Sequence, residues 1–153
     1  MSAFAIAVYD VVLFVHVAAV VIAFGGSFVY PLIFSVAGRA APAQRVALHD
    51  LGARYGRTYA SYGLLVVVLA GAYLASDRGL WGEPWVAGPL LIAIIIGGIG
   101  GGYLGPRERR LVGLAERDDD EYRGVLRQVR RASLAVGGLV LVAVFLMVTK
   151  LGA

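Results

Sequence analysis

Between Asp10 and Arg39 the chain runs for 28 residues without a charged side chain, and most of these residues are apolar. An α-helix rises about 1.5 Å per residue, so about 20 apolar residues cross the hydrocarbon core of a bilayer. Three more uncharged runs occupy residues 58–76, 84–106 and 132–149. Only 16% of all residues are charged, whereas a soluble domain carries about 25%. The sequence therefore predicts four transmembrane helices.

The four runs predict an all-α fold, a bundle of four transmembrane helices in one integral membrane domain that covers residues 1–153. Pro42 fits the first turn of a helix, so we expect the segment after it to be largely helical. Apolar side chains before the last run recur at helical spacing and predict an amphipathic helix that leads into it; they are Tyr122, Val125, Leu126 and Val129. The expected spans are 9–36, 58–76, 84–106 and 132–150, with loops at 37–57, 77–83 and 107–131.

Arginine is concentrated in two of the three loops. Twelve of the fourteen Lys and Arg residues lie at 39–57 and 107–131, and only Arg78 and Lys150 lie on the opposite side. An excess of basic residues marks the cytoplasmic side of a membrane protein. We therefore expect both termini outside and helical extensions of the bundle in the cytoplasm. The natural partners of this charge are the lipid bilayer and its anionic headgroups, and not nucleic acid.

His16 is the one histidine inside the four uncharged runs. An ionisable group within a membrane span costs free energy, which makes it a candidate for function. On a helical projection at about 100° per residue, Tyr9, Ser27 and Tyr30 share its face. A companion stripe on the second span contains tyrosines at similar spacing; they are Tyr55, Tyr59, Tyr62 and Tyr73.

Depth in the membrane places these two stripes opposite each other, because neighbouring helices are antiparallel. His16 is about as far from the outer end of its helix as Tyr73 is from the outer end of the next helix, and Tyr30 is similarly matched to Tyr62. A buried polar group needs a partner, so we expect the ring of His16 near the hydroxyl of Tyr73. The predicted cofactor or polar ligand site comprises His16, Tyr73, Ser27, Tyr30 and Tyr62.

The sequence leaves three interpretations of His16 open. The ring can join two helices by a hydrogen bond, act as an axial ligand of haem or a metal, or relay protons beside a substrate. The chain has no cysteine, which excludes disulfides and thiolate metal sites. The second histidine, His49, precedes Asp50 in a basic loop, where we expect both side chains to be solvated. The sequence contains no catalytic dyad and no metal-ligand cluster, so we do not expect an enzyme.

The third span is rich in glycine. Four-residue spacing of small residues lets helix backbones approach closely, and two such series are Gly97, Gly101 and Gly105, and Gly98 and Gly102. The sequence leaves open whether these glycines pack inside one bundle or join two copies into a homo-oligomer.

Proline and tryptophan mark two further features of the spans. Pro31 cannot donate a backbone hydrogen bond, and together with Gly25 and Gly26 it predicts a kink or a frayed inner end in the first helix. Trp81 and Trp85 flank the start of the third span, where indole rings are expected to anchor the helix at the membrane interface.

Nearly the whole chain resembles a family of small predicted bacterial integral membrane proteins, a domain-of-unknown-function family. The similar stretches are LFVHVAAVVIAFGG, VLAGAYLA, GGYLGPRERRLVGLA and VAVFLMVTK. A histidine followed nine residues later by Gly-Gly is also similar to the copper-resistance membrane proteins and to the membrane-bound bacterial protoporphyrinogen oxidase, which binds haem b. The resemblance implies a multi-pass protein of the bacterial inner (plasma) membrane.

The distant resemblance implies one candidate ligand, His16. The chain departs from the oxidase pattern because no Arg or Lys interrupts its four uncharged runs. It departs from copper-handling proteins because it lacks cysteine and has only two methionines, Met1 and Met147.

Three functions remain open at this stage. The first is a small cofactor protein in which His16 binds haem b between the first two spans. The second is a small transporter or channel, or an accessory part of one. The third is an assembly subunit with no chemistry of its own.

Overall fold

The computed structural model describes residues 2–117 and 120–151, and every regular element within them is a helix. The α-helices are α1 (Ser2–Ala37), α2 (Pro42–Tyr55), α3 (Ser61–Asp77), α4 (Pro84–Gly98), α5 (Gly105–Leu114) and α6 (Asp120–Thr149). Two π-helical segments continue the chain without a break, Gly56–Ala60 from α2 into α3 and Ile99–Leu104 from α4 into α5. A 3₁₀ turn, Leu80–Gly82, precedes α4.

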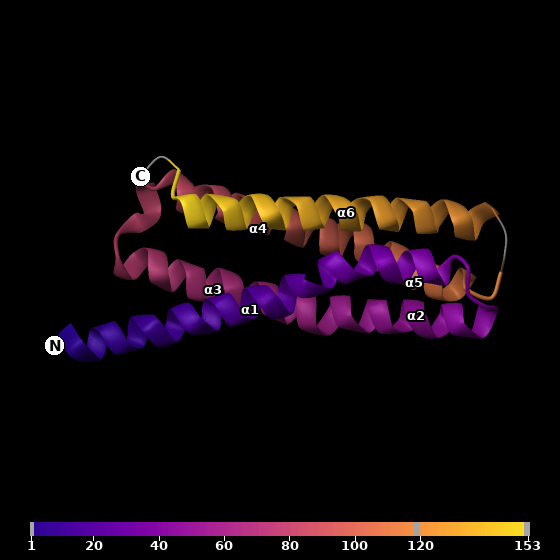
Figure 1. Ribbon diagram of the computed structural model, residues 1–153, viewed down its shortest axis with the longest axis horizontal. Helices are drawn as coiled ribbons and strands as arrows, with labels where there is room; N and C mark the ends of the chain where they lie inside the picture. Colours follow the sequence, from indigo (N-terminus) through magenta and orange to yellow (C-terminus); the bar gives the residue numbers. More distant parts are fainter. Residues whose placement is uncertain (1, 118–119, 152–153) are drawn as a thin grey trace.

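The helices form four long rods that run side by side, with both ends of the chain at the same end of the bundle (Figure 1). Each rod is long and apolar enough to cross a membrane, as expected of a multi-pass membrane protein. A rod of 30 residues is about 45 Å long and exceeds the hydrocarbon core of about 30 Å, so in a bilayer its end would reach the polar region. The four rods are Val8–Ala37, Pro42–Asp77, Pro84–Leu114 and Asp120–Thr149.

Two prolines and a glycine set the boundaries between rods. Pro42 and Pro84 stand in the first turns of α2 and α4, where a missing backbone N–H costs no intrahelical bond. Gly79 adopts a left-handed conformation with φ of +63°, which lets the chain reverse direction after α3.

The apolar surface of the bundle faces outward, and α1 and α3 meet through small residues. Gly63 of α3 lies so close to α1 that a Cβ added there would be 2.7 Å from Cβ of Ala23. Such close contact between small residues is typical of helices packed in a membrane. The outward apolar side chains, which suit contact with lipid, include Phe14, Val21, Leu32, Leu69, Ile94 and Phe145.

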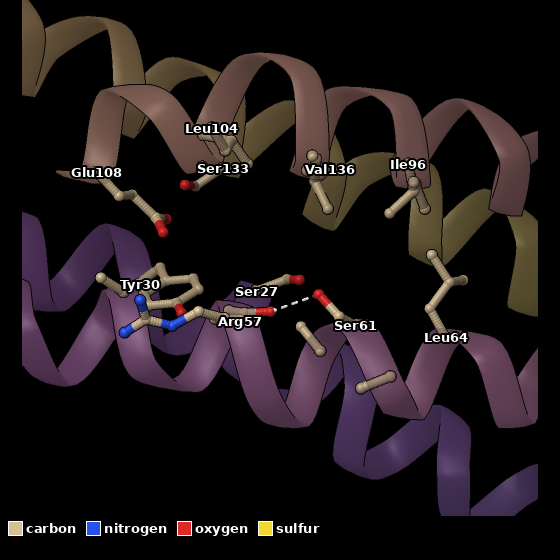
Figure 2. A pocket seen from close by; sticks show the side chains of 18 of the residues that line it. Ser27, Tyr30, Arg57, Ser61, Leu64, Ile96, Leu104, Glu108, Ser133 and Val136 are labelled. Carbon is tan, nitrogen blue, oxygen red and sulfur yellow. Dashed lines mark hydrogen bonds between the residues drawn. The ribbon is translucent and has the colours of Figure 1, made fainter. Parts of the chain in front are cut away.

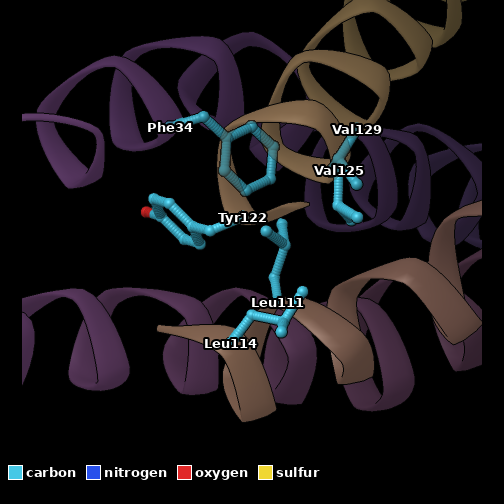
Figure 3. Packing of buried hydrophobic residues seen from close by; sticks show 6 residues of the cluster. All are labelled: Phe34, Leu111, Leu114, Tyr122, Val125 and Val129. Atoms are coloured by element: carbon cyan, nitrogen blue, oxygen red, sulfur yellow. The ribbon is translucent and has the colours of Figure 1, made fainter. Parts of the chain in front are cut away.

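A buried cluster closes the arginine-rich end of the bundle. Figure 3 shows its six side chains, which come from α1, α5 and α6: Phe34, Leu111, Leu114, Tyr122, Val125 and Val129. The predicted amphipathic stripe at the start of α6 is confirmed, because Tyr122, Val125 and Val129 are buried and Leu126 packs against them.

His49 of α2 also belongs to this end, and the prediction that it is solvated is wrong. Its side chain is only 2% exposed, and its Nε2 is hydrogen-bonded to the hydroxyl of Tyr122 at 3.0 Å. The ring stacks on Phe34, with ring centroids 6.0 Å apart. The neighbouring Asp50 instead accepts a hydrogen bond from Nε of Arg54, one helical turn away.

The first helix does not fray at Pro31, because α1 continues to Ala37. Pro31 leaves the carbonyl of Ser27 without its intrahelical donor. Gly137 of α6 packs against this carbonyl, since a Cβ added at Gly137 would lie 3.7 Å from the oxygen.

Candidate functional site

Two cavities lie between the helices, one toward each end of the bundle. The first, called here the His16 cavity, has a volume of about 380 Å³ and is near the chain termini. The second, the Glu108 cavity, has a volume of about 430 Å³ and is at the arginine-rich end. Both volumes fall in the usual range for small-molecule sites, about 300–1,000 Å³.

The imidazole of His16 is held by a backbone carbonyl across the helix pair α1 and α3. Its Nδ1 lies 3.0 Å from the carbonyl oxygen of Val67. A carbonyl only accepts, so Nδ1 carries the proton and donates, and the lone pair of the neutral ring is on Nε2. Gly71 makes room for the ring, because a Cβ added there would lie 3.1 Å from Cε1.

The Nε2 atom of His16 is the free end of this arrangement. The residue as a whole is only 8% exposed. Its Nε2 atom has no hydrogen-bond partner among the described residues, yet it keeps some solvent-accessible surface. The side chain lines the His16 cavity. An imidazole with Nδ1 fixed by a carbonyl and Nε2 open is arranged as metal-ligating histidines usually are.

The other walls of the His16 cavity are apolar and aromatic, with a few polar atoms. Trp85 of α4 has its indole N–H buried with no partner among the described residues. The Nζ atom of Lys150 lies 5.4 Å from the centre of the Trp85 ring. Met147 of α6 contributes a thioether, a second side chain able to ligate a metal ion.

The two tryptophans differ in how they meet the anchoring prediction. Trp81 is exposed, and its indole N–H donates to the hydroxyl of Ser76 at 3.1 Å, as an interfacial ring can. Trp85 departs from the prediction because its indole N–H is enclosed in the bundle and does not face water.

The predicted contact between His16 and Tyr73 is wrong, since Val67 supplies the hydrogen-bond partner. Tyr73 is 42% exposed and Tyr62 is 67% exposed, and neither lines the His16 cavity or the Glu108 cavity. Ser27 and Tyr30 both line the Glu108 cavity. The single polar seam expected from the sequence is therefore divided between two separate sites.

The π-helical segment Gly56–Ala60 explains this error. A π-turn takes one more residue than an α-turn, so every later side chain is rotated by roughly 100° relative to a regular helix. Tyr55 precedes the segment and does face α1, where its hydroxyl accepts from the backbone N–H of Gly26 at 3.1 Å and donates to the carbonyl of Ile22. Tyr62 and Tyr73 follow it and turn outward.

Glu108 of α5 is the central side chain of the second cavity. It is 8% exposed and has no hydrogen bond or ion pair among the described residues. Figure 2 shows its carboxylate directed across the cavity toward Tyr30. A Cβ added at Gly56 would lie 3.3 Å from Oε2 of Glu108 and 3.6 Å from the Tyr30 hydroxyl. Both oxygens thus meet over the start of the first π-helical segment.

Hydroxyl groups line the same cavity as this carboxylate. Ser133 of α6 is buried, and its Oγ has no partner among the described residues. Tyr30 donates to the carbonyl of Gly52 at 2.6 Å, and Ser61 donates to the carbonyl of Gly56 at 2.9 Å. Each of these oxygens keeps lone pairs that can accept a further hydrogen bond.

Four glycines of the third rod line this cavity: Gly97, Gly100, Gly101 and Gly105. Within the chain, a Cβ added at Gly98, Gly101 or Gly102 would meet nothing within 4 Å, so the expected close approach is absent there. Gly97 does touch a neighbour, Leu64 of α3, and Gly105 lies beside the carbonyl of Gly100. Packing of the exposed glycines on a second copy stays a prediction.

Glu108 and Ser133 were missed by sequence reasoning. Glu108 lies two residues beyond the uncharged run, among arginines typical of a solvated loop. Helical spacing gives no reliable signal for Glu108, because the π-helical segment Ile99–Leu104 precedes it and shifts the phase of the helix.

No protein family, curated protein or solved structure matches the chain. Within residues 2–117 and 120–151, no group of three or more His, Cys, Asp or Glu side chains could hold a metal ion. One cavity is built around an imidazole, and the other around a buried carboxylate with hydroxyls.

Proposed function

We propose that the protein binds haem b in the His16 cavity, where Nε2 of His16 would hold the iron. The observation that carries this proposal is the 3.0 Å hydrogen bond from Nδ1 to the Val67 carbonyl, which leaves Nε2 open at a cavity wall. Haem proteins commonly use a histidine in this way, and the hydrogen bond fixes both the tautomer and the ring orientation.

The other residues of the cavity fit a haem. Apolar and aromatic walls would suit a macrocycle, and the thioether of Met147 would be available to hold the iron together with His16. The ammonium of Lys150 suits a propionate, and the unpartnered indole N–H of Trp85 can donate to one. Bound haem would supply one-electron redox chemistry.

The arginine distribution extends the proposal to orientation and location. Twelve of the fourteen basic residues lie at one end of the bundle, which supports a cytoplasmic position for that end in a bacterial plasma membrane. Both termini and the His16 cavity would then lie toward the outer face. Anionic headgroups would contact the arginine-rich end.

The visible absorption spectrum of detergent-purified protein from haem-replete cells tests the proposal. We expect a Soret band in the wild type, its loss in His16→Ala, and a changed band position in Met147→Leu. Tyr73→Phe is the matched control, because Tyr73 belongs to the facing helix but does not line the cavity. A wild type without a Soret band, or a His16→Ala variant that retains it unchanged, would refute haem ligation by His16 and leave the transport and assembly hypotheses.

A further inference from the structure

We propose that the Glu108 cavity is a second binding site, for an amphipathic organic cation that carries an ammonium group on an apolar body. Glu108 is the counter-ion in this site, and the cavity is separate from the one that holds His16. The proposal does not depend on haem binding.

The first argument is the unpaired carboxylate. Glu108 is more than nine-tenths buried, and none of the described residues forms an ion pair or hydrogen bond with it; the exposed Arg109 acts on it only at longer range. A buried carboxylate without such partners costs several kcal/mol, and a cation that enters the cavity removes much of this cost. A ligand with positive charge therefore fits the deepest ionisable group of the cavity.

The second argument is the set of acceptors around it. An ammonium group has up to three N–H donors and no acceptor. The oxygens of Glu108, Tyr30 and Ser133 line the same cavity, and Ser133 Oγ is buried with no partner among the described residues. A carboxylate and two hydroxyls supply four acceptor oxygens. They match an ammonium with N–H donors better than a quaternary amine, which has no N–H.

The third argument is the opposite end of the cavity. Figure 2 shows Glu108 at one end and the apolar side chains of Leu64 and Ile96 at the other, with Val136 between. All three apolar residues line the cavity. An apolar body attached to the ammonium would bury its surface there, at about 25 cal/mol per Å².

Two arginines also line this cavity. Because both are exposed to water, they do not favour an anion as the ligand. Arg57 and Arg109 are exposed, so water solvates their charges, whereas Glu108 is enclosed. A metal cation is disfavoured because no cluster of three or more ligating side chains exists in the described part of the chain. Both π-helical segments contribute to the walls, and π-turns occur frequently at functional sites.

Fluorescence titration of the detergent-purified full chain with two dansyl probes tests this site. Dansylcadaverine carries a primary ammonium, and N-pentyl dansylamide has the same fluorophore and chain without the charge. After subtraction of a protein-free micelle blank, we expect saturable binding of the ammonium probe, at least tenfold tighter than that of the neutral probe. Glu108→Gln should weaken the ammonium probe at least tenfold and leave the neutral probe within about twofold, because a tenfold change corresponds to about 1.4 kcal/mol.

Matched variants keep the test decisive. Glu116→Gln removes an exposed carboxylate just after α5 and should leave both affinities unchanged. If Glu108→Gln fails to fold, Ile96→Trp replaces it, since a larger side chain at the apolar end should weaken both probes. The proposal would be overturned if the wild type bound neither probe saturably, or bound both with equal affinity. It would also be overturned if Glu108→Gln, or Ile96→Trp in its place, left the affinity for the ammonium probe unchanged.

Discussion

The imidazole of His16 and the carbonyl oxygen of Val67 are 3.0 Å apart, and their hydrogen bond joins α1 to α3 across 51 residues of sequence. Gly71, one helical turn beyond Val67, leaves the space that the ring occupies. The hydrogen bond and the space are parts of one arrangement, because a side chain at position 71 would displace the ring from the carbonyl.

Gly71→Val should therefore destabilise the bundle. A Cβ at this position would lie 3.1 Å from Cε1 of His16, and the γ-methyl groups of valine add further bulk, so the ring is pushed from its place beside the Val67 carbonyl. A buried donor left unpaired costs about 1–3 kcal/mol. Thermal unfolding in detergent should show a lower midpoint than wild type. Gly138→Val is the control, since a Cβ there meets nothing within 4 Å, and equal losses in both variants would contradict the packing described for His16.

Gly63 makes the closest approach between α1 and α3, so Gly63→Ala should also lower the unfolding midpoint. The added Cβ would lie 2.7 Å from Cβ and 3.1 Å from Cα of Ala23, and backbone cannot move aside as a flexible side chain can. Overpacking of this kind costs about 1–3 kcal/mol. Gly98→Ala, which meets open space, should be neutral or slightly stabilising because alanine favours helix. A neutral Gly63→Ala would show that the helices are further apart.

The number and character of the spans could be predicted from the sequence because they depend only on the length of apolar runs. The burial of three α6 side chains could be predicted as well, because α6 is a regular helix and its 3.6-residue period holds throughout; they are Tyr122, Val125 and Val129. Regular helices and apolar length are local properties that a single sequence records well.

The candidate site could be predicted only in part, because the second and third rods do not keep a regular α-helical period along their length. His16 was found because an ionisable group in a membrane span is rare, but its partner was misassigned. Tyr62 and Tyr73 lie beyond the segment Gly56–Ala60, where a π-turn rotates the following residues away from α1. Glu108 was overlooked because continuous helix carries an arginine-flanked segment back into the bundle, which no charge pattern reveals.

Tyr122→Phe should destabilise the arginine-rich end of the bundle. Removal of the hydroxyl takes away the 3.0 Å hydrogen bond to Nε2 of His49, while His49 stays 2% exposed and its Nδ1 has no partner among the described residues. The buried imidazole would then lose an essential partner, at about 1–3 kcal/mol. The unfolding midpoint should fall for this variant and stay within error for Tyr59→Phe, whose ring is exposed. A fall of equal size in both would assign the effect to the loss of any tyrosine hydroxyl.

The chain lacks cysteine, so single substitutions can establish its orientation in the membrane. Gly82 lies exposed in the turn between α3 and α4, and Gly113 lies exposed in α5 at the arginine-rich end. Because basic residues mark the cytoplasmic side, a membrane-impermeant maleimide should label Gly82→Cys in intact cells. It should label Gly113→Cys only after the membrane is permeabilised. The reverse pattern would place the termini and the His16 cavity on the cytoplasmic side, and labelling of both sites in intact cells would indicate two orientations. The first pattern alone agrees with a His16 cavity that is reached from outside.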